Sequence, residues 1–141
     1  MNEMNEIQHV ISKFAHSFDT KEWERMRSTL SDEVLCDYSD LRGGVKDTVG
    51  GDVYVAKRME ALDNIHTHHL ISNYEITVTG GKASCTASAI IWRKAQGKEF
   101  NTHAQYTFEL QKKTHSWRIC SIKQEIYWNK GDPSIHSGVQ K

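Results

Sequence analysis

The first half of the chain places its apolar residues at helical spacing. Within residues 6–18 they recur every three or four positions, the pattern of an amphipathic helix with one face on a core. That face consists of Ile7, Val10, Ile11, Phe14 and Phe18. The same spacing predicts a second, shorter helix over residues 23–30 and a third over residues 52–62. An alternating segment at residues 34–39 predicts a strand, and the four glycines of residues 41–51 predict a loop.

From residue 66 onward the period changes to two. Strands are predicted over residues 70–79, 83–93, 100–111 and 116–128, and the glycine pair at residues 80–81 is typical of a hairpin turn. Helices followed by consecutive strands predict the α+β class: a strongly curved antiparallel sheet wrapped around three helices. The open end of such a sheet leaves a pocket.

The length of 141 residues fits a single domain, 1–141, with a core over about residues 6–133 and a polar tail at 134–141. Eighteen basic residues balance eighteen acidic ones, which speaks against a nucleic-acid partner. The absence of a long apolar run predicts no membrane partner, and the polar N-terminus does not resemble a secretory signal. Three cysteines without a CxxC pair indicate reduced core thiols and a cytoplasmic location.

Asp19 directly follows Phe18, the last residue of the first apolar face. Glu22 stands three residues later, so that Asp19 and Glu22 form a capping-box pattern at the start of the second helix. The same carboxylate would serve equally well as one member of an acid–base pair. The sequence leaves both interpretations open.

Residues 66–69 read His-Thr-His-His at the start of the first long strand. Three interpretations compete: a zinc site, for which the spacing lacks a recognised ligand pattern; idle solvated histidines; and a general base. Alternation along a strand places His69, Ile71 and Asn73 on one face. A histidine base needs a carboxylate to orient it, and Asp19 is the candidate.

Tyr38 lies in the segment Leu-Cys-Asp-Tyr-Ser at residues 35–39. It is either a strand aromatic with its hydroxyl at the water edge, or a hydrogen-bond donor to a substrate oxygen.

Four segments together resemble the SnoaL-like family of the nuclear transport factor 2-like superfamily, and their motifs are closest to those of the scytalone dehydratases. They are Phe-Ala-His-Ser-Phe-Asp-Thr-Lys-Glu-Trp-Glu-Arg-Met-Arg at 14–27, Cys-Asp-Tyr-Ser at 36–39, Thr-His-His-Leu-Ile at 67–71 and Ile-Tyr-Trp-Asn-Lys-Gly-Asp-Pro at 126–133. The resemblance implies a cone-shaped α+β barrel. It also implies that Asp19 orients a catalytic His69 and that Tyr38 faces the substrate.

The chain departs from the dehydratase pattern at several places. Phe18 stands in place of a second active-site tyrosine, and Trp92 or Arg93 stands near the place of a second histidine. A Ser/Asn pair of those enzymes falls roughly on Gln105 and Thr107. Scytalone itself is therefore not the expected substrate.

These observations predict a small-molecule lyase of the dehydratase type that uses no metal and no organic cofactor. Its catalytic residues would be Asp19, His69 and Tyr38, and its partner a small cyclic or aromatic substrate. The predicted substrate-binding residues in an apolar pocket are Phe14, Phe18, Ile71, Asn73, Arg93, Gln105 and Thr107.

Other functions remain open. They are an isomerase, cyclase or hydrolase on the same pocket, a non-catalytic ligand-binding or interaction module, and an accessory subunit like the small subunits of ring-hydroxylating dioxygenases. Apolar side chains on both faces of the predicted strands indicate a homodimer or homotrimer formed through the outer face of the sheet.

Overall fold

The computed structural model describes residues 2–136. Its helices are α1 (Glu3–Thr20), α2 (Trp23–Arg27), α3 (Ser39–Arg42) and α4 (Gly51–Ala61). The side chain of Asn2 caps α1 by accepting a hydrogen bond from the Asn5 N–H at 2.8 Å. Lys21, in the left-handed conformation, ends it. The three predicted helices are confirmed, and the single turn α3 occupies part of the predicted loop.

The second helix is shorter than predicted. It stops at Arg27, and Leu30 opens a strand instead of closing the helix. The Thr29 hydroxyl donates to the carbonyl of Met26 at 2.7 Å, which satisfies a carbonyl that the helix leaves free at its end. Leu30 is buried in either arrangement, so its apolar character did not distinguish between them.

Six strands form one sheet: β1 (Leu30–Asp37), β2 (Asp47–Gly50), β3 (His66–Thr79), β4 (Lys82–Ala95), β5 (Lys98–Lys113) and β6 (Ser116–Gly131). Their order is β2-β1-β6-β5-β4-β3. The pairs β3–β4, β4–β5 and β5–β6 are antiparallel, as predicted, whereas β1 runs parallel to β6. The short β2, in the predicted glycine-rich loop, pairs antiparallel with β1.

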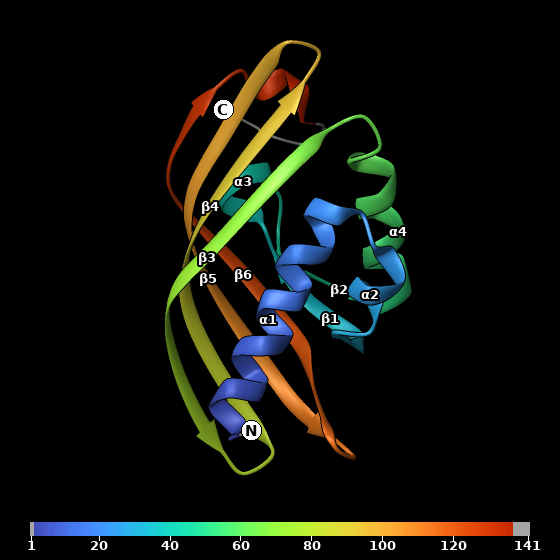
Figure 1. Cartoon of the computed structure of the whole chain (residues 1–141), viewed down its shortest axis with the longest axis vertical. Helices are drawn as coiled ribbons and strands as arrows, with labels where there is room; N and C mark the ends of the chain where they lie inside the picture. Colours follow the sequence, from blue (N-terminus) through green and yellow to red (C-terminus); the bar gives the residue numbers. More distant parts are fainter. Residues whose placement is uncertain (1, 137–141) are drawn as a thin grey trace.

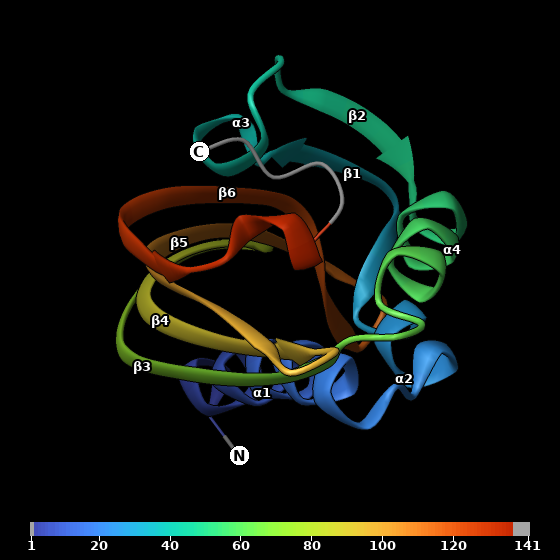
Figure 2. The same ribbon diagram turned by 90° about the horizontal axis from the view of Figure 1, so that it is seen from above.

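The sheet curls strongly, with α1 running along β3 and with α2 and α4 on the open side (Figures 1 and 2). Alternate residues of β4 and β5 are buried, so one face of each strand lies on the core. The core joins α1 to the concave face through Ile7, Ile11, Phe14, Phe108, Trp117, Ile119 and Ile122.

The chain continues past β6 into a short 3-10 turn, η1 (Pro133–Ile135). The predicted polar tail begins within this turn, and residues 137–141 lie outside the described residues. No helix within residues 2–136 is both long and apolar enough to cross a bilayer.

Candidate active site

Asp19 lies in the last turn of α1, which continues to Thr20. The residue before α2 is Glu22, and its side chain makes no capping hydrogen bond. The interpretation of Asp19 as the cap of the second helix is therefore wrong. A carboxylate near a helix C-terminus faces the negative end of the helix dipole and is disfavoured there. Its contacts with β3 must offset that cost.

The Asp19 carboxylate accepts three hydrogen bonds from β3. Oδ1 accepts from the Thr67 hydroxyl at 3.0 Å and lies 2.7 Å from Nδ1 of His69. Oδ2 accepts from the backbone N–H of His69 at 2.8 Å. The His69 and Asp19 side chains are only 8% and 14% exposed. The predicted meeting of these two side chains is present, and each oxygen of the carboxylate has a donor.

The His69 ring is fixed by this contact and by Phe18, whose ring centroid lies 4.6 Å away. A carboxylate beside Nδ1 favours the neutral tautomer with its proton on Nδ1, which leaves Nε2 with a free lone pair. Burial lowers the pKa of His69 from its usual value, and the hydrogen bond to Asp19 opposes that lowering. The ring is therefore neutral near pH 7 and suited to accept a proton.

The other histidines of the 66–69 segment lie elsewhere. His66 and His68 are exposed, because alternation turns them to the opposite face from His69. The His68 ring stacks on Trp92, with centroids 5.3 Å apart. Among residues 2–136, no three His, Cys, Asp or Glu side chains cluster in a way that could bind a metal ion.

His69 lines a cavity at the open end of the curved sheet. The apolar lining residues are Phe18, Leu41, Ala61, Leu62 and Ile91, and the polar ones are Tyr38, Arg42, Arg58, Thr67, Arg93, Tyr106, Gln124 and His136. The cavity's free volume is about 30 Å³. That is space for one or two water molecules, so a larger ligand requires movement of the lining side chains.

Three predicted pocket residues do line this cavity with His69: Phe18, Tyr38 and Arg93. Tyr38 follows β1 and precedes α3, and its hydroxyl lies 2.7 Å from that of Tyr54. Burial raises the pKa of Tyr38 well above its usual value, so the hydroxyl stays protonated. It is partnered inside the protein and does not lie at the water edge.

The other predicted substrate-binding residues lie outside the cavity, and these assignments are corrected. Phe14 and Ile71 pack in or against the hydrophobic core. Asn73 has a φ of 56° at an irregularity in the β3–β4 pairing, so it leaves the inward face. Gln105 and Thr107 point outward because the buried Tyr106 between them faces the cavity. Asn73 and Gln105 instead line an open hollow on the outer face.

Sequence reasoning missed Arg42, Arg58, Tyr106 and Gln124. Arg58 follows Tyr54 by four residues on α4, and both are buried on the same face of the helix. That spacing was a usable signal, since an arginine on an apolar helix face is uncommon. Tyr106 and Gln124 lie at inward positions of neighbouring strands and are joined by a hydrogen bond of 2.9 Å.

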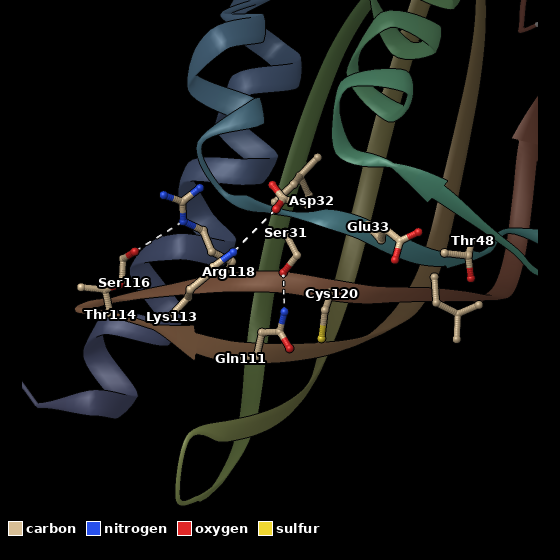
Figure 3. A pocket seen from close by; sticks show the side chains of 12 residues that line it. Ser31, Asp32, Glu33, Thr48, Gln111, Lys113, Thr114, Ser116, Arg118 and Cys120 are labelled. Carbon is tan, nitrogen blue, oxygen red and sulfur yellow. Dashed lines mark hydrogen bonds and ion pairs between the residues drawn. The ribbon is translucent and has the colours of Figure 1, made fainter.

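A larger hollow lies elsewhere, over β1, β5 and β6. Figure 3 shows its polar walls, with the Lys113–Asp32 ion pair and the hydrogen bond between Gln111 and Ser31. Its volume is about 670 Å³, but it is open and shares no residue with the cavity beside His69. By size alone this hollow would be the candidate active site. The buried contact between a carboxylate and an imidazole favours the smaller cavity instead.

The family model described as a SnoaL-like domain matches residues 1–123. The chain is 26% identical over 130 residues to dehydratase GME11372 of Pestalotiopsis microspora, covering 83% of this chain and 82% of that one. The structure of Kfla4162 from Kribbella flavida is similar at a TM-score of 0.88 and 20% identity, over 91% and 93% of the two chains. A protein from Novosphingobium aromaticivorans DSM 12444 described as a candidate scytalone dehydratase gives 0.80 at 16% identity, over 91% and 86%.

Proposed function

This chain belongs to the SnoaL-like domain family, and we propose that it is a lyase of the dehydratase type that eliminates water from a small organic substrate. The observation that carries the proposal is the 2.7 Å contact between Asp19 and His69 at the edge of a cavity. The dehydratase relative supports the same reaction class.

In this mechanism His69 acts first as base and then as acid. Nε2 takes a proton from the carbon next to an electron-withdrawing carbonyl, and the electron pair of that C–H bond forms an enolate. The enolate then forms a carbon–carbon double bond as the C–O bond of the β-hydroxyl breaks. The departing hydroxyl takes the proton back from Nε2, so that water leaves and His69 returns to its neutral form.

Asp19 and Tyr38 assist this transfer. The Asp19 carboxylate keeps the proton of neutral His69 on Nδ1 and stabilises the imidazolium that forms, as the acidic member does in other carboxylate–histidine pairs. The Tyr38 hydroxyl lines the cavity, where it donates a hydrogen bond to the oxygen that gains negative charge. Tyr54, at 2.7 Å, positions that hydroxyl.

A non-catalytic binding module is the second candidate, because the arginines that line the cavity could hold an anionic ligand without any turnover. The difference between the two is turnover. A binding module would retain its ligand unchanged, whereas a lyase would convert a β-hydroxy ketone into a conjugated product.

The test is a screen of cyclic β-hydroxy ketones, with the conjugated product followed by ultraviolet absorbance. His69→Asn should abolish turnover of any substrate that the parent converts. His68→Asn is the matched control, because His68 is adjacent but lies on the outer face of β3, so its activity should be retained. Turnover that survives His69→Asn contradicts the mechanism.

A further inference from the structure

Three arginines line the cavity beside His69 and lack acidic partners among the described residues. Arg58 and Arg93 are only 7% and 4% exposed, and Arg42 is half-buried. Within residues 2–136, the arginine side chains in ion pairs with Asp or Glu are those of Arg25 and Arg27. Buried charges are costly unless they are paired. The cavity therefore carries positive charge that the described protein groups do not neutralise.

Neutral groups stabilise these cations only in part. The guanidinium of Arg58 lies 4.2 Å from the ring centroid of Tyr54 and 5.0 Å from that of Tyr38. Arg42 approaches the Tyr38 ring at 5.2 Å, and Arg93 donates to the Thr102 hydroxyl at 2.7 Å. Arg58 also hydrogen-bonds the Tyr38 side chain, and Tyr54 and Tyr38 raise the pKa of Arg58 against the effect of burial. These cation–π contacts and hydrogen bonds orient the guanidinium groups, but neutral partners do not cancel their charge.

The three charges also act on one another. Burial and the neighbouring charge of Arg58 lower the pKa of Arg42. Burial lowers the pKa of Arg93 to about 10, which still leaves it protonated near pH 7. Mutual repulsion of this kind is relieved when an anion binds between the charges.

Two buried polar atoms of the lining have no hydrogen-bond partner within the described part of the chain: Nε of Arg42, a donor, and Oε1 of Gln124, an acceptor. Gln124 is 2% exposed, and its amide nitrogen already donates to the Tyr106 hydroxyl. Buried polar groups are nearly always satisfied. A ligand with an acceptor for Arg42 and a donor for Gln124 would complete both.

We propose that the cavity binds a small organic carboxylate that also carries a hydroxyl group. Arg42 and Arg58 hold the carboxylate, since guanidinium groups match its planar geometry, and Gln124 Oε1 accepts from the hydroxyl. As a statement about the substrate this rests on the proposed function, whereas the anion site does not depend on turnover.

The charge balance fits this assignment. The three guanidinium groups of the lining, together with the Asp19 carboxylate behind His69, sum to a formal charge of +2 when His69 is neutral. A bound carboxylate compensates one of these charges. The enolate formed during elimination would compensate the second, and Arg93, which lines the same cavity as His69, would stabilise it.

Binding is measured by calorimetry with benzoate, 3-hydroxybenzoate and benzyl alcohol as probes, using the His69→Asn variant beside the parent. Benzoate should bind both forms, and benzyl alcohol about tenfold more weakly or worse, because it lacks the charge. The added hydroxyl of 3-hydroxybenzoate should improve affinity, and Gln124→Leu should remove that improvement. Equal affinity for benzoate and benzyl alcohol would overturn the proposal, as would inorganic phosphate binding as tightly as benzoate.

The decisive variant is Arg42→Gln, because Arg42 is half-buried on the single turn α3 and its loss should not prevent folding. It should weaken benzoate binding about tenfold or more. Arg118→Gln, in the distant hollow of Figure 3, is the matched control and should leave affinity unchanged. Unchanged affinity in Arg42→Gln refutes the site.

If a neutral ketone is dehydrated but benzoate does not bind, the anion site fails and the lyase stands. If benzoate binds but no substrate is turned over, the lyase fails and the site stands.

Discussion

Replacing Asp19 with asparagine separates the charge of this residue from its shape. The carboxylate accepts from three donors, namely the Thr67 hydroxyl, the His69 backbone N–H and His69 Nδ1. An amide has one oxygen and one NH₂ group, so it cannot accept from all three. The backbone N–H is fixed, so the amide oxygen must turn toward it. The NH₂ group then faces Thr67 and Nδ1, both of which can become acceptors.

This rearrangement predicts a large loss of activity with little loss of stability. To accept from the new amide NH₂ group, His69 must carry its proton on Nε2, the atom that takes the substrate proton in the proposed mechanism. In serine proteases the equivalent change lowers kcat by about 10⁴-fold, and we expect a loss of that order here. The free energy of unfolding should change by less than about 1 kcal/mol, because the hydrogen bonds are re-formed and a disfavoured charge leaves the C-terminus of α1. Asp19→Ala should instead cost about 1–3 kcal/mol, since the His69 backbone N–H loses its acceptor.

Three measurements test this reasoning. Nitrogen-15 NMR of the imidazole reports which ring nitrogen carries the proton, urea unfolding reports stability, and ultraviolet absorbance reports elimination. The expected result for Asp19→Asn is a proton on Nε2, near-parental stability and no measurable turnover. Retention of the Nδ1 proton, or full activity in the variant, would show that the carboxylate does not control the tautomer.

The remaining predictions concern the Tyr38 hydroxyl, the titration of His69 and the assembly. Tyr38→Phe should lower kcat by about 10²-fold and leave KM nearly unchanged, because it removes one hydrogen bond to developing charge. An equal loss of kcat in Tyr54→Phe would show that the two hydroxyl groups act as a unit. The acidic limb of the kcat/KM profile should lie below pH 6.5, the usual pKa of histidine, because the pKa of folded His69 is lowered; a limb above 6.5 would contradict this. For the same reason the unfolded chain binds a proton at His69 more readily than the folded protein does. The contribution of His69 to stability is therefore present above pH 6.5 and lost as pH falls through the folded pKa. Thermal melts at several pH values should show a weaker pH dependence in His69→Asn. A homodimer or homotrimer stays our prediction for the assembly. The reason is that Leu70, Tyr127 and Trp128 are each more than half exposed on the outer face of the sheet. Light scattering that gives the 16.2 kDa monomer at micromolar concentration would count against it.

The sequence predicted this fold well where periodicity was strong. In the proposed site, it anticipated a side-chain contact only where a motif was specific. The apolar face of α1 and the long hairpins follow from spacing alone. The contact of Asp19 with His69 joins residues 50 positions apart, and it was expected through the family resemblance and not through any local rule.

The failures have local physical causes. Gln105 was placed in the pocket instead of Tyr106, because a shift of one residue reverses every side chain of a strand. Asn73 does not lie on the inward face, because the β3–β4 pairing shifts register between Ser72 and Glu75, and the local sequence does not indicate that shift. The pairing of β2 with β1 stabilises a glycine-bounded segment that carries little strand propensity of its own.

The one parallel pairing among the described strands, β1 beside β6, has a consequence for how the protein folds. The hairpins of β3–β6 join segments close in sequence, whereas β1 and α3 reach β6 across long intervals; Asp40 and Ile126, for example, are 86 positions apart. Contacts between sequence-distant segments carry the larger loop-closure entropy and tend to form late. Tyr38 and Arg42 belong to this late-docking part, and His69 belongs to the hairpins. The cavity therefore lies between a set of strands paired by local hairpins and a segment that docks on them across a long interval of sequence.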